Sequence, residues 1–225
     1  AIYKGVNGSI EWSNGSHLDM VHSTEYCMGI AWGGNNVYYL FNGMSGAIDR
    51  YDFAAPHFQG HSFHEDASVD RYSFASPLSR VVDVPSNLAM SGSVLYIADT
   101  GNGRVVAFDT ATPGTAAELF YTHESIEAQR YDAPSTVFAT TETLAAEWGA
   151  EVQPSGLAFL DENLVVANHA TGHITILGPD GAVIRTIDTM LGRGLGGLTV
   201  ADGVVYFTHL TTRTTYRLDV VVPPA

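Results

Sequence analysis

The stretch LYIADTGNGRVVAFD, residues 95–109, decides the fold because its pattern returns elsewhere in the chain. It reads as a strand, a turn rich in Gly and Asn, and a second alternating strand. Together with the small residues of a shorter strand before it, it predicts a three-stranded meander. Three other segments follow the same order, so the chain carries four copies, which start at Gly29, Asn87, Gly156 and Gly197.

The spacing of the copies favours a β-propeller over a β-sandwich. The last two copies start 41 residues apart, and one propeller blade takes about 40 residues. A sandwich also alternates and turns often, but its strands do not repeat a turn sequence at this spacing. We therefore predict an all-β propeller domain, residues 1–225, with at least four blades at about 29–74, 87–123, 156–189 and 197–222.

Each blade needs a fourth, outer strand, and the segments after three of the copies supply candidates. These are VDRYSF (69–74), AAELFYTH (116–123) and VIRTIDT (183–189). The last copy lacks one, so the N-terminal segment 1–12 is its candidate outer strand, which would close the ring and hide sheet edges. Between the second and third copies, TETLAAEWGA (140–150) predicts a short helix with a Thr cap.

The composition excludes several classes of partner. Ten Lys and Arg against 24 Asp and Glu give a net charge of −14, so nucleic acid and anionic membrane surfaces are poor partners. No apolar run approaches the roughly 20 residues of a membrane span. A single cysteine, Cys27, excludes an intrachain disulfide. Cations and protein surfaces remain as partners.

The second copy resembles an NHL repeat, whose blades carry a YVADTGNxRV signature that LYIADTGNGRVVAFD matches closely. The resemblance extends in weaker form over most of residues 29–219 and implies a propeller, commonly of six blades, so the four blades recognised here are expected to be part of a larger, six-bladed ring. Members of this family include RNA-binding modules, scaffolds and zinc-dependent amidating lyases. SHLDMVH followed by MGIAW is similar to bacterial secreted NHL-like proteins, which implies an extracellular or periplasmic location.

An alignment of the four copies places Phe41, Asp99, His169 and His209 in one column after the second strand. Two readings of this column stay open: a side chain that caps the turn, and a metal or substrate site at the channel mouth. The run SHLDMVH adds His17, Asp19 and His22 ahead of the first blade. Imidazole and carboxylate are common ligands of zinc and copper, so the predicted metal site consists of His17, Asp19, His22, His169 and His209.

A second, weaker cation site is predicted in the insertion PHFQGHSFHEDASVDRY, residues 56–72. Alternate oxygen-bearing residues in such a run are typical of calcium loops, although a solvated acidic loop explains the same pattern. The candidate ligands are His57, His61, His64, Asp66 and Asp70.

Two functions follow from these patterns. The first is a metal-dependent lyase or hydrolase, or a metal-binding protein, in which a divalent ion at the channel mouth polarises a carbonyl or generates hydroxide. The second is a non-enzymatic binding or scaffold propeller, a subunit of a larger assembly that uses one face for a protein or small-molecule ligand. No nucleophile elbow or phosphate-binding loop is present.

Overall fold

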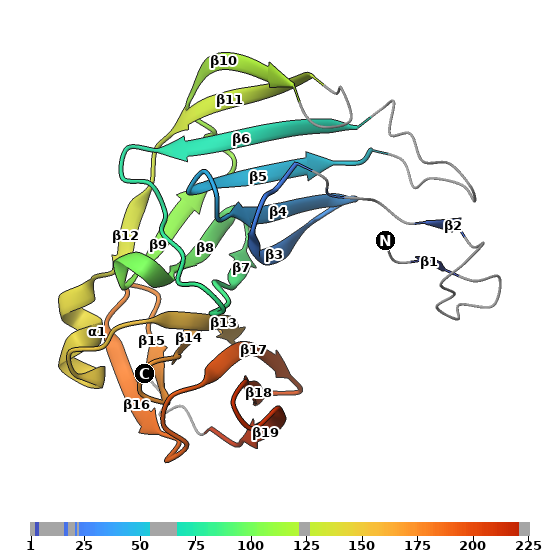
Figure 1. Cartoon of the computed structure of the whole chain (residues 1–225). Helices are drawn as coiled ribbons and strands as arrows, with labels where there is room; N and C mark the ends of the chain where they lie inside the picture. Colours follow the sequence, from blue (N-terminus) through green and yellow to red (C-terminus); the bar gives the residue numbers. More distant parts are fainter. Residues whose placement is uncertain are drawn as a thin grey trace.

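The structure is a computed structural model that describes residues 3–4, 16–17, 21, 23–54, 67–121 and 127–220. Four successive β-sheets follow one another around an arc (Figure 1). This arrangement confirms the predicted all-β architecture with at least four blades. We call the sheets blades 1 to 4 in chain order.

Blades 2 to 4 are antiparallel sheets in which consecutive strands pair, except that the outer strand of blade 2 comes after an insertion. Blade 2 contains β7 (Leu88–Ser91), β8 (Val94–Asp99), β9 (Arg104–Asp109) and β12 (Thr136–Ala139), with a short 3₁₀ turn at Thr100–Asn102 between β8 and β9. Blade 3 contains β13 (Pro154–Leu160), β14 (Asn163–Asn168), β15 (His173–Leu177) and β16 (Val183–Asp188). Blade 4 has three strands among the described residues, β17 (Leu195–Ala201), β18 (Val204–His209) and β19 (Thr214–Leu218).

Blade 1 is larger because a hairpin from the following insertion joins it. Its meander is β3 (Cys27–Gly34), β4 (Val37–Asn42), β5 (Ala47–Asp52) and β6 (Ser68–Phe74). The hairpin of β10 (Thr115–Tyr121) and β11 (Glu127–Ala133) continues this sheet, with β11 parallel to β6. The prediction that 116–123 forms the outer strand of blade 2 is therefore wrong, and β12 takes that place by pairing with β9.

Side-chain packing explains why the hairpin joins blade 1. Tyr131 of β11 lies against Tyr72 of β6, with ring centroids 5.5 Å apart. The guanidinium of Arg71 lies 4.6 Å from the centroid of the Phe120 ring, which is a cation–π contact. An alternating strand pattern identifies a strand but does not say which open sheet edge it joins, and here these aromatic contacts favour the edge of blade 1.

The core consists of one apolar cluster at each junction between consecutive blades and a fourth cluster, around Leu40 and Phe53, on the face of blade 1 that points away from blade 2. Phe41 and Ile97 are among the fully buried residues between blades 1 and 2. Leu157 and Leu177 lie between blades 2 and 3, and Phe207 lies between blades 3 and 4. The chain is thus a stack of sheets held face to face, as β-sheet packing requires.

The helix confirms the prediction for 140–150. α1 spans Thr141–Trp148, and the side chain of its N-cap Thr140 accepts a hydrogen bond from the Thr143 amide. The indole Nε1 of Trp148 donates to Thr175 Oγ1 at 2.7 Å, and this bond is buried. The helix therefore packs against blade 3 through the C-terminal residue of its last turn.

The predicted outer strand for blade 4 lies mostly outside the described residues. Of the segment 1–12, only β1 (Tyr3–Lys4) is described, and it pairs with β2 (Ser16–His17) in a separate two-stranded sheet. The described part of this segment therefore does not join blade 4. No helix in the described part of the chain has the length and apolar content of a membrane span.

Candidate functional site

Strand pairing corrects the column that the sequence alignment predicts. In every blade, one residue of the second strand pairs with the equivalent position of the first strand. The residue two positions later, at the end of the second strand, is therefore equivalent in all four blades. The column is Asn42, Asp99, Asn168 and His209, and all four are buried. Phe41 and His169, which the sequence alignment places in the column, are each one residue out of register.

The column residues share one structural role, because each joins the turn to the segment that enters its own blade. Asn42 Nδ2 donates to the Ser23 carbonyl at 3.4 Å. Asp99 Oδ1 accepts from the Ser79 amide at 2.7 Å. Asn168 Oδ1 accepts from the Gln153 amide at 2.8 Å. These bonds satisfy buried backbone groups that would otherwise lose their water partners.

His209 does the same work with an imidazole. Its Nε2 donates to the Arg193 carbonyl at 3.0 Å, and its Nδ1 faces the Thr212 hydroxyl at 2.9 Å and the Thr212 amide at 3.3 Å. A carbonyl can only accept, so the Arg193 contact assigns the ring proton to Nε2. With 3% of its surface exposed, His209 has both ring nitrogens engaged with the protein.

His169 belongs to a second set of contacts, which joins blade 2 to blade 3 and blade 3 to blade 4. Its Nδ1 donates to the Leu195 carbonyl at the start of blade 4, at 2.9 Å. In blade 2 the equivalent residue is Thr100, whose hydroxyl donates to the Pro154 carbonyl at the start of blade 3, at 2.6 Å. Pro154 and Leu195 are themselves equivalent, since they pair with Asn168 and His209.

The surroundings of His169 favour its neutral form. Burial lowers the pKa of the imidazole, and the positive charge of Arg193 lowers it further, while the hydrogen bond to the Leu195 carbonyl opposes this shift. Arg193 itself reaches out to Glu151, with Nη2 and Oε2 2.5 Å apart, where both side chains are exposed. A neutral ring that donates through Nδ1 keeps a lone pair on Nε2.

The structure places only part of the first predicted metal site. Asp19 and His22 lie outside the described residues, and for His17 only the backbone in β2 is described. His169 and His209 lie on neighbouring turns but use ring nitrogens on different carbonyls. Within the described ranges, no group of three or more His, Cys, Asp or Glu is placed to hold a metal ion.

The second predicted cation site lies almost wholly outside the described residues. This holds for His57, His61, His64 and Asp66. Asp70 is described in β6, where its carboxylate pairs with Arg50 Nη1 at 3.1 Å. Burial raises the pKa of Asp70, and the Arg50 guanidinium opposes that rise. The pairing gives this carboxylate a structural partner within the sheet.

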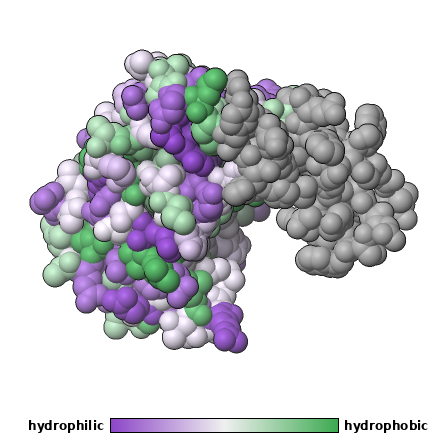
Figure 2. All heavy atoms as spheres, turned by 45° about the horizontal axis from the view of Figure 1, so that its top comes forward, coloured by the Kyte–Doolittle hydropathy of each residue, from purple (hydrophilic) through white to green (hydrophobic). Residues whose placement is uncertain are grey.

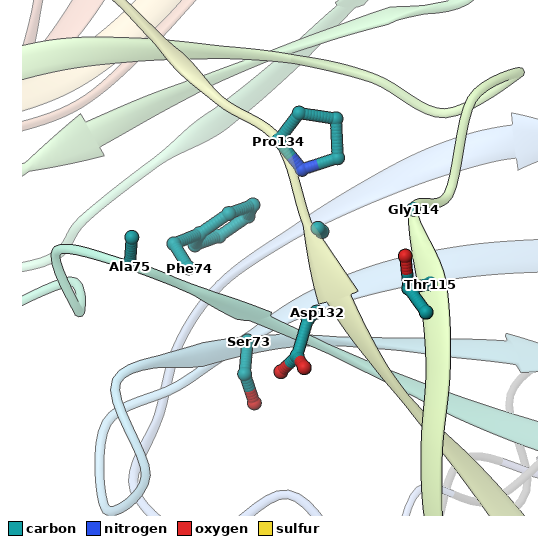
Figure 3. Close-up of a pocket in the computed structure, with 8 residues that line it drawn as sticks. Ser73, Phe74, Ala75, Gly114, Thr115, Asp132 and Pro134 are labelled. Atoms are coloured by element: carbon teal, nitrogen blue, oxygen red, sulfur yellow. The ribbon is translucent and has the colours of Figure 1, made fainter.

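A shallow cavity of about 540 Å³ opens where the hairpin β10–β11 leaves blade 1. Figure 3 shows the side chains of Ser73 and Asp132 pointing to the same side of the sheet, as expected for residues paired across β6 and β11. Thr115 and Asp132 are exposed. The cavity contains none of the predicted ligands, and its open, mainly apolar lining makes it a surface site rather than an enclosed one.

The feature that sequence reasoning missed is the β3 edge of the outer face of blade 1, since Leu40 and Tyr51 on the rest of this face are buried. Ile30 and Trp32 of β3 are 56% and 67% exposed. Their equivalents in the other blades pack against the preceding blade, and these are Leu88 and Met90, Leu157 and Phe159, and Leu198 and Val200. The aligned segments MGIAWG, SNLAMS, SGLAFL and GGLTVA carry this signal, but exposure becomes visible only when the blades are placed.

Polar and apolar residues are interspersed over the described face in the space-filling view (Figure 2). Exposed apolar side chains scattered singly are normal on a protein surface. Ile30 and Trp32 differ from such residues because they occupy positions that are used for blade contacts at every other junction.

The comparisons with known proteins agree on the fold. No protein-family model matches the chain, and no curated protein matches it in sequence. A streptogramin B lyase structure is similar over 91% of this chain and 59% of its own, at 11% identity and a TM-score of 0.53. A protein of unknown function from Bacteroides thetaiotaomicron is similar over 91% of this chain and 44% of its own, at 12% identity and a TM-score of 0.53.

The chain has the β-propeller fold. At 11% and 12% identity, the likeness to these two structures concerns the fold alone, since unrelated functions share such folds. The chain also spans less than two thirds of the length of either of them, 59% and 44%.

Proposed function

We propose that this chain is a non-enzymatic binding propeller that holds a protein partner on the exposed β3 edge of the outer face of blade 1. The observation that carries the proposal is the exposure of Ile30 and Trp32 at positions that are otherwise buried between blades. Three internal junctions support it, since each uses the same two positions of its first strand for apolar packing.

The energetics of such a face favour association. Burying one large apolar side chain stabilises a contact by about 1.5–3 kcal/mol. Tryptophan is also among the residues that most often dominate binding energy at protein interfaces. Leaving both side chains in water is a cost that a partner removes. The net charge of the chain, −14, favours a protein over a nucleic acid as the binding partner.

The column geometry supports this function over chemistry at the histidines. His209 replaces the Asp or Asn of its sister blades and, like Asn42, donates to a carbonyl of the segment that enters its blade. His169 makes the same blade-to-blade bond as Thr100. Of the two readings that the sequence left open, these contacts favour turn and junction structure.

Metal binding by His17, Asp19, His22, His169 and His209 remains a second proposal, with zinc or copper as the ion. One observation favours it: His169 donates through Nδ1, which leaves Nε2 with the lone pair that a metal ligand needs. Elemental analysis of protein prepared without chelator tests it. Bound zinc or copper that is lost on His169→Ala supports the site, and a metal content near zero overturns it.

The binding proposal is tested by photo-cross-linking in extracts of the source cells. A photoreactive phenylalanine analogue at Trp32 is compared with the same group at Met190, which is 84% exposed and lies on the turn after β16. We expect position 32 to form an adduct with one protein. An excess of the unlabelled chain should suppress this adduct by competing for the same partner. Equal labelling from both positions, or none from position 32, contradicts the proposal.

The extracytoplasmic location and the membership of the NHL family rest on the sequence resemblance. The calcium site at 57–70 is likewise a prediction from sequence pattern. None of these is needed for the binding function proposed here.

A further inference from the structure

We propose that Arg80 and Tyr26 form a binding site for a carboxylate, and that the protein held at the β3 edge supplies this group from an acidic side chain. The proposal rests on the binding function above and adds the chemistry of the partner. Tyr26 directly precedes β3. The site therefore lies at the beginning of the strand that carries Ile30 and Trp32.

The junction of blades 1 and 2 departs from the rule that the next two junctions follow. There, Thr100 and His169 each donate to the carbonyl at the start of the following blade. The equivalent residue in blade 1 is Gly43, which has no side chain for such a bond. The side chain at this junction comes from the opposite direction, because Arg80, in the segment that enters blade 2, reaches back over Tyr26 at the entry of blade 1.

The backbone and the aliphatic stem of Arg80 are both held in place. The amide of the preceding residue, Ser79, donates to Asp99 Oδ1 at 2.7 Å, and its carbonyl accepts from the Gly101 amide at 2.7 Å. The stem passes close over Gly43, where a Cβ would lie only 2.6 Å from Arg80 Cδ. A side chain that is already ordered loses little conformational freedom when a ligand binds.

Tyr26 supplies an exposed platform for the guanidinium. The guanidinium carbon of Arg80 lies 4.3 Å from the centroid of the Tyr26 ring, which is a cation–π contact. Tyr26 is 56% exposed, and its backbone has a φ of +51°. Bulky residues rarely adopt this left-handed conformation, and strained residues of this kind gather at ligand sites.

The charge of Arg80 has no carboxylate partner within the described part of the chain. Six other arginines pair there with an acidic side chain, and these are Arg50, Arg71, Arg104, Arg130, Arg193 and Arg217. Arg80 makes no such pair, although 24 acidic residues face ten basic ones in the sequence. A guanidinium binds a carboxylate through two parallel hydrogen bonds, so an acidic side chain of a partner complements it.

The surroundings of Arg80 favour an acidic residue that lies beside apolar ones. Met44 is 63% exposed, and its turn contacts the segment before β3, since the Met44 amide donates to the Glu25 carbonyl at 3.3 Å. The net charge of −14 repels polyanions such as nucleic acid. A partner segment with one carboxylate among apolar side chains fits both Arg80 and the exposed side chains of β3.

The carboxylate site is tested first on the unmodified chain, with acetate as the probe at constant ionic strength. NMR follows the arginine Nε–H resonances, and the loss of one signal in Arg80→Lys assigns Arg80. Arg213, which is exposed on the turn between β18 and β19, is the matched control. We expect acetate to bind Arg80 more tightly than Arg213 by about threefold or more, because the Arg80 guanidinium is already ordered.

Two variants at position 26 test the part that the ring plays. Tyr26→Phe keeps the ring and should keep the affinity of Arg80 for acetate, whereas Tyr26→Leu should lower it to that of Arg213. Equal affinities of Arg80 and Arg213 in the unmodified chain overturn the site. A preference for Arg80 that survives Tyr26→Leu overturns the role of Tyr26.

The source of the carboxylate is tested with the photoreactive group at position 32. Arg80→Gln should lower the yield of the protein adduct about tenfold or more, as expected for the loss of a charge-assisted hydrogen bond. Arg80→Lys, which keeps the charge and the stem, should retain part of the yield. Arg213→Gln is the matched control and should leave the yield unchanged.

The outcomes separate this inference from the binding function. An adduct at position 32 that is unaffected by Arg80→Gln leaves the binding function standing and overturns the assignment of the carboxylate to the partner. If acetate still prefers Arg80 in that case, the site takes a small free carboxylate instead. The absence of any adduct at position 32 overturns both the binding function and the inference that rests on it.

Discussion

At the scale of single residues, His209 shows that the residue type in one position can change while its hydrogen bond to the entry segment of the blade is kept. Asn42, Asp99 and Asn168 use a short amide or carboxylate to reach the entry segment of their blades. His209 reaches Arg193 with a ring and uses its other nitrogen for Thr212. The histidine in this column is therefore explained by its hydrogen bonds to backbone groups, and this explanation needs no bound ligand.

This role predicts the effect of substitutions at 209. His209→Leu keeps the volume but leaves the Arg193 carbonyl and the Thr212 amide without this partner, at a cost of about 1–3 kcal/mol. His209→Asn should cost less, because asparagine fills the equivalent positions 42 and 168. Urea unfolding monitored by circular dichroism measures both. A neutral His209→Leu, or a larger loss with asparagine, contradicts the assigned role.

The depressed pKa of His169 predicts a dependence of stability on pH. Burial is the main cause of the shift, aided by the positive charge of Arg193. An unfolded histidine titrates near 6.5, so on acidification the unfolded chain takes up this proton first. The stability that neutral His169 contributes is complete above that pH and is lost as the pH falls through its lower folded pKa.

We therefore expect the free energy of unfolding to fall more steeply with acidification in the wild type than in His169→Gln. Glutamine can still donate to the Leu195 carbonyl but does not titrate. Unfolding in urea at a series of pH values from about 8 to about 5 measures both slopes. Identical slopes in the two proteins would rule out this role of His169.

At the scale of elements, the inner strands of neighbouring blades approach each other so closely that side chains are excluded. A Cβ on Gly156 of β13 would lie 2.7 Å from the Gly196 carbonyl oxygen and 2.7 Å from Leu198 Cβ, both in β17. Neither neighbour is the flexible end of a long side chain. The glycine at this position is required by the distance between two backbones.

Gly156→Ala should accordingly force β13 and β17 apart and cost roughly 1–3 kcal/mol, as overpacking does. Gly178→Ala is the matched control, because its closest contact would be the Asp180 side chain, at 3.1 Å, which can move. Thermal unfolding of the two variants gives the comparison. Equal melting temperatures of the two variants would contradict this expectation, because they would mean that the junction of blades 3 and 4 accommodates the added methyl group without loss of stability.

At the scale of the whole molecule, the open arc makes the chain a row of blades in which extensive contacts join consecutive neighbours. Each junction has its own apolar cluster. In such a row, stability is approximately a sum of local terms and of terms between neighbours. A destabilising substitution in a terminal blade should therefore lower the stability of that blade and of its neighbour more than that of the distant blades.

Phe207→Ala, at the junction of blades 3 and 4, tests this. It removes a buried ring at a cost of about 3–5 kcal/mol, and hydrogen exchange should then quicken in blade 4 while blade 1 stays protected. Phe108→Ala, between blades 1 and 2, is the reciprocal control and should expose blades 1 and 2 first. Uniform loss of protection in either variant would show that the arc unfolds as one unit.

The amino-acid sequence by itself determined the repeat, and through it the fold. The period and the turn residues of segments such as 95–109 are local properties, so the all-β architecture, most blade strands and the Thr-capped helix followed from them. The sequence also excluded acidic polymers as partners, because net charge needs no coordinates.

Only the tertiary structure decided the rest. The edge joined by the hairpin β10–β11 depends on the packing of Phe120 and Tyr131 against side chains of blade 1, which strand pattern does not encode. The true column depends on strand register, where a slip of one residue moves a side chain to the other face. The exposure of Trp32 depends on which blades are neighbours in space, and that is a property of the assembled arc.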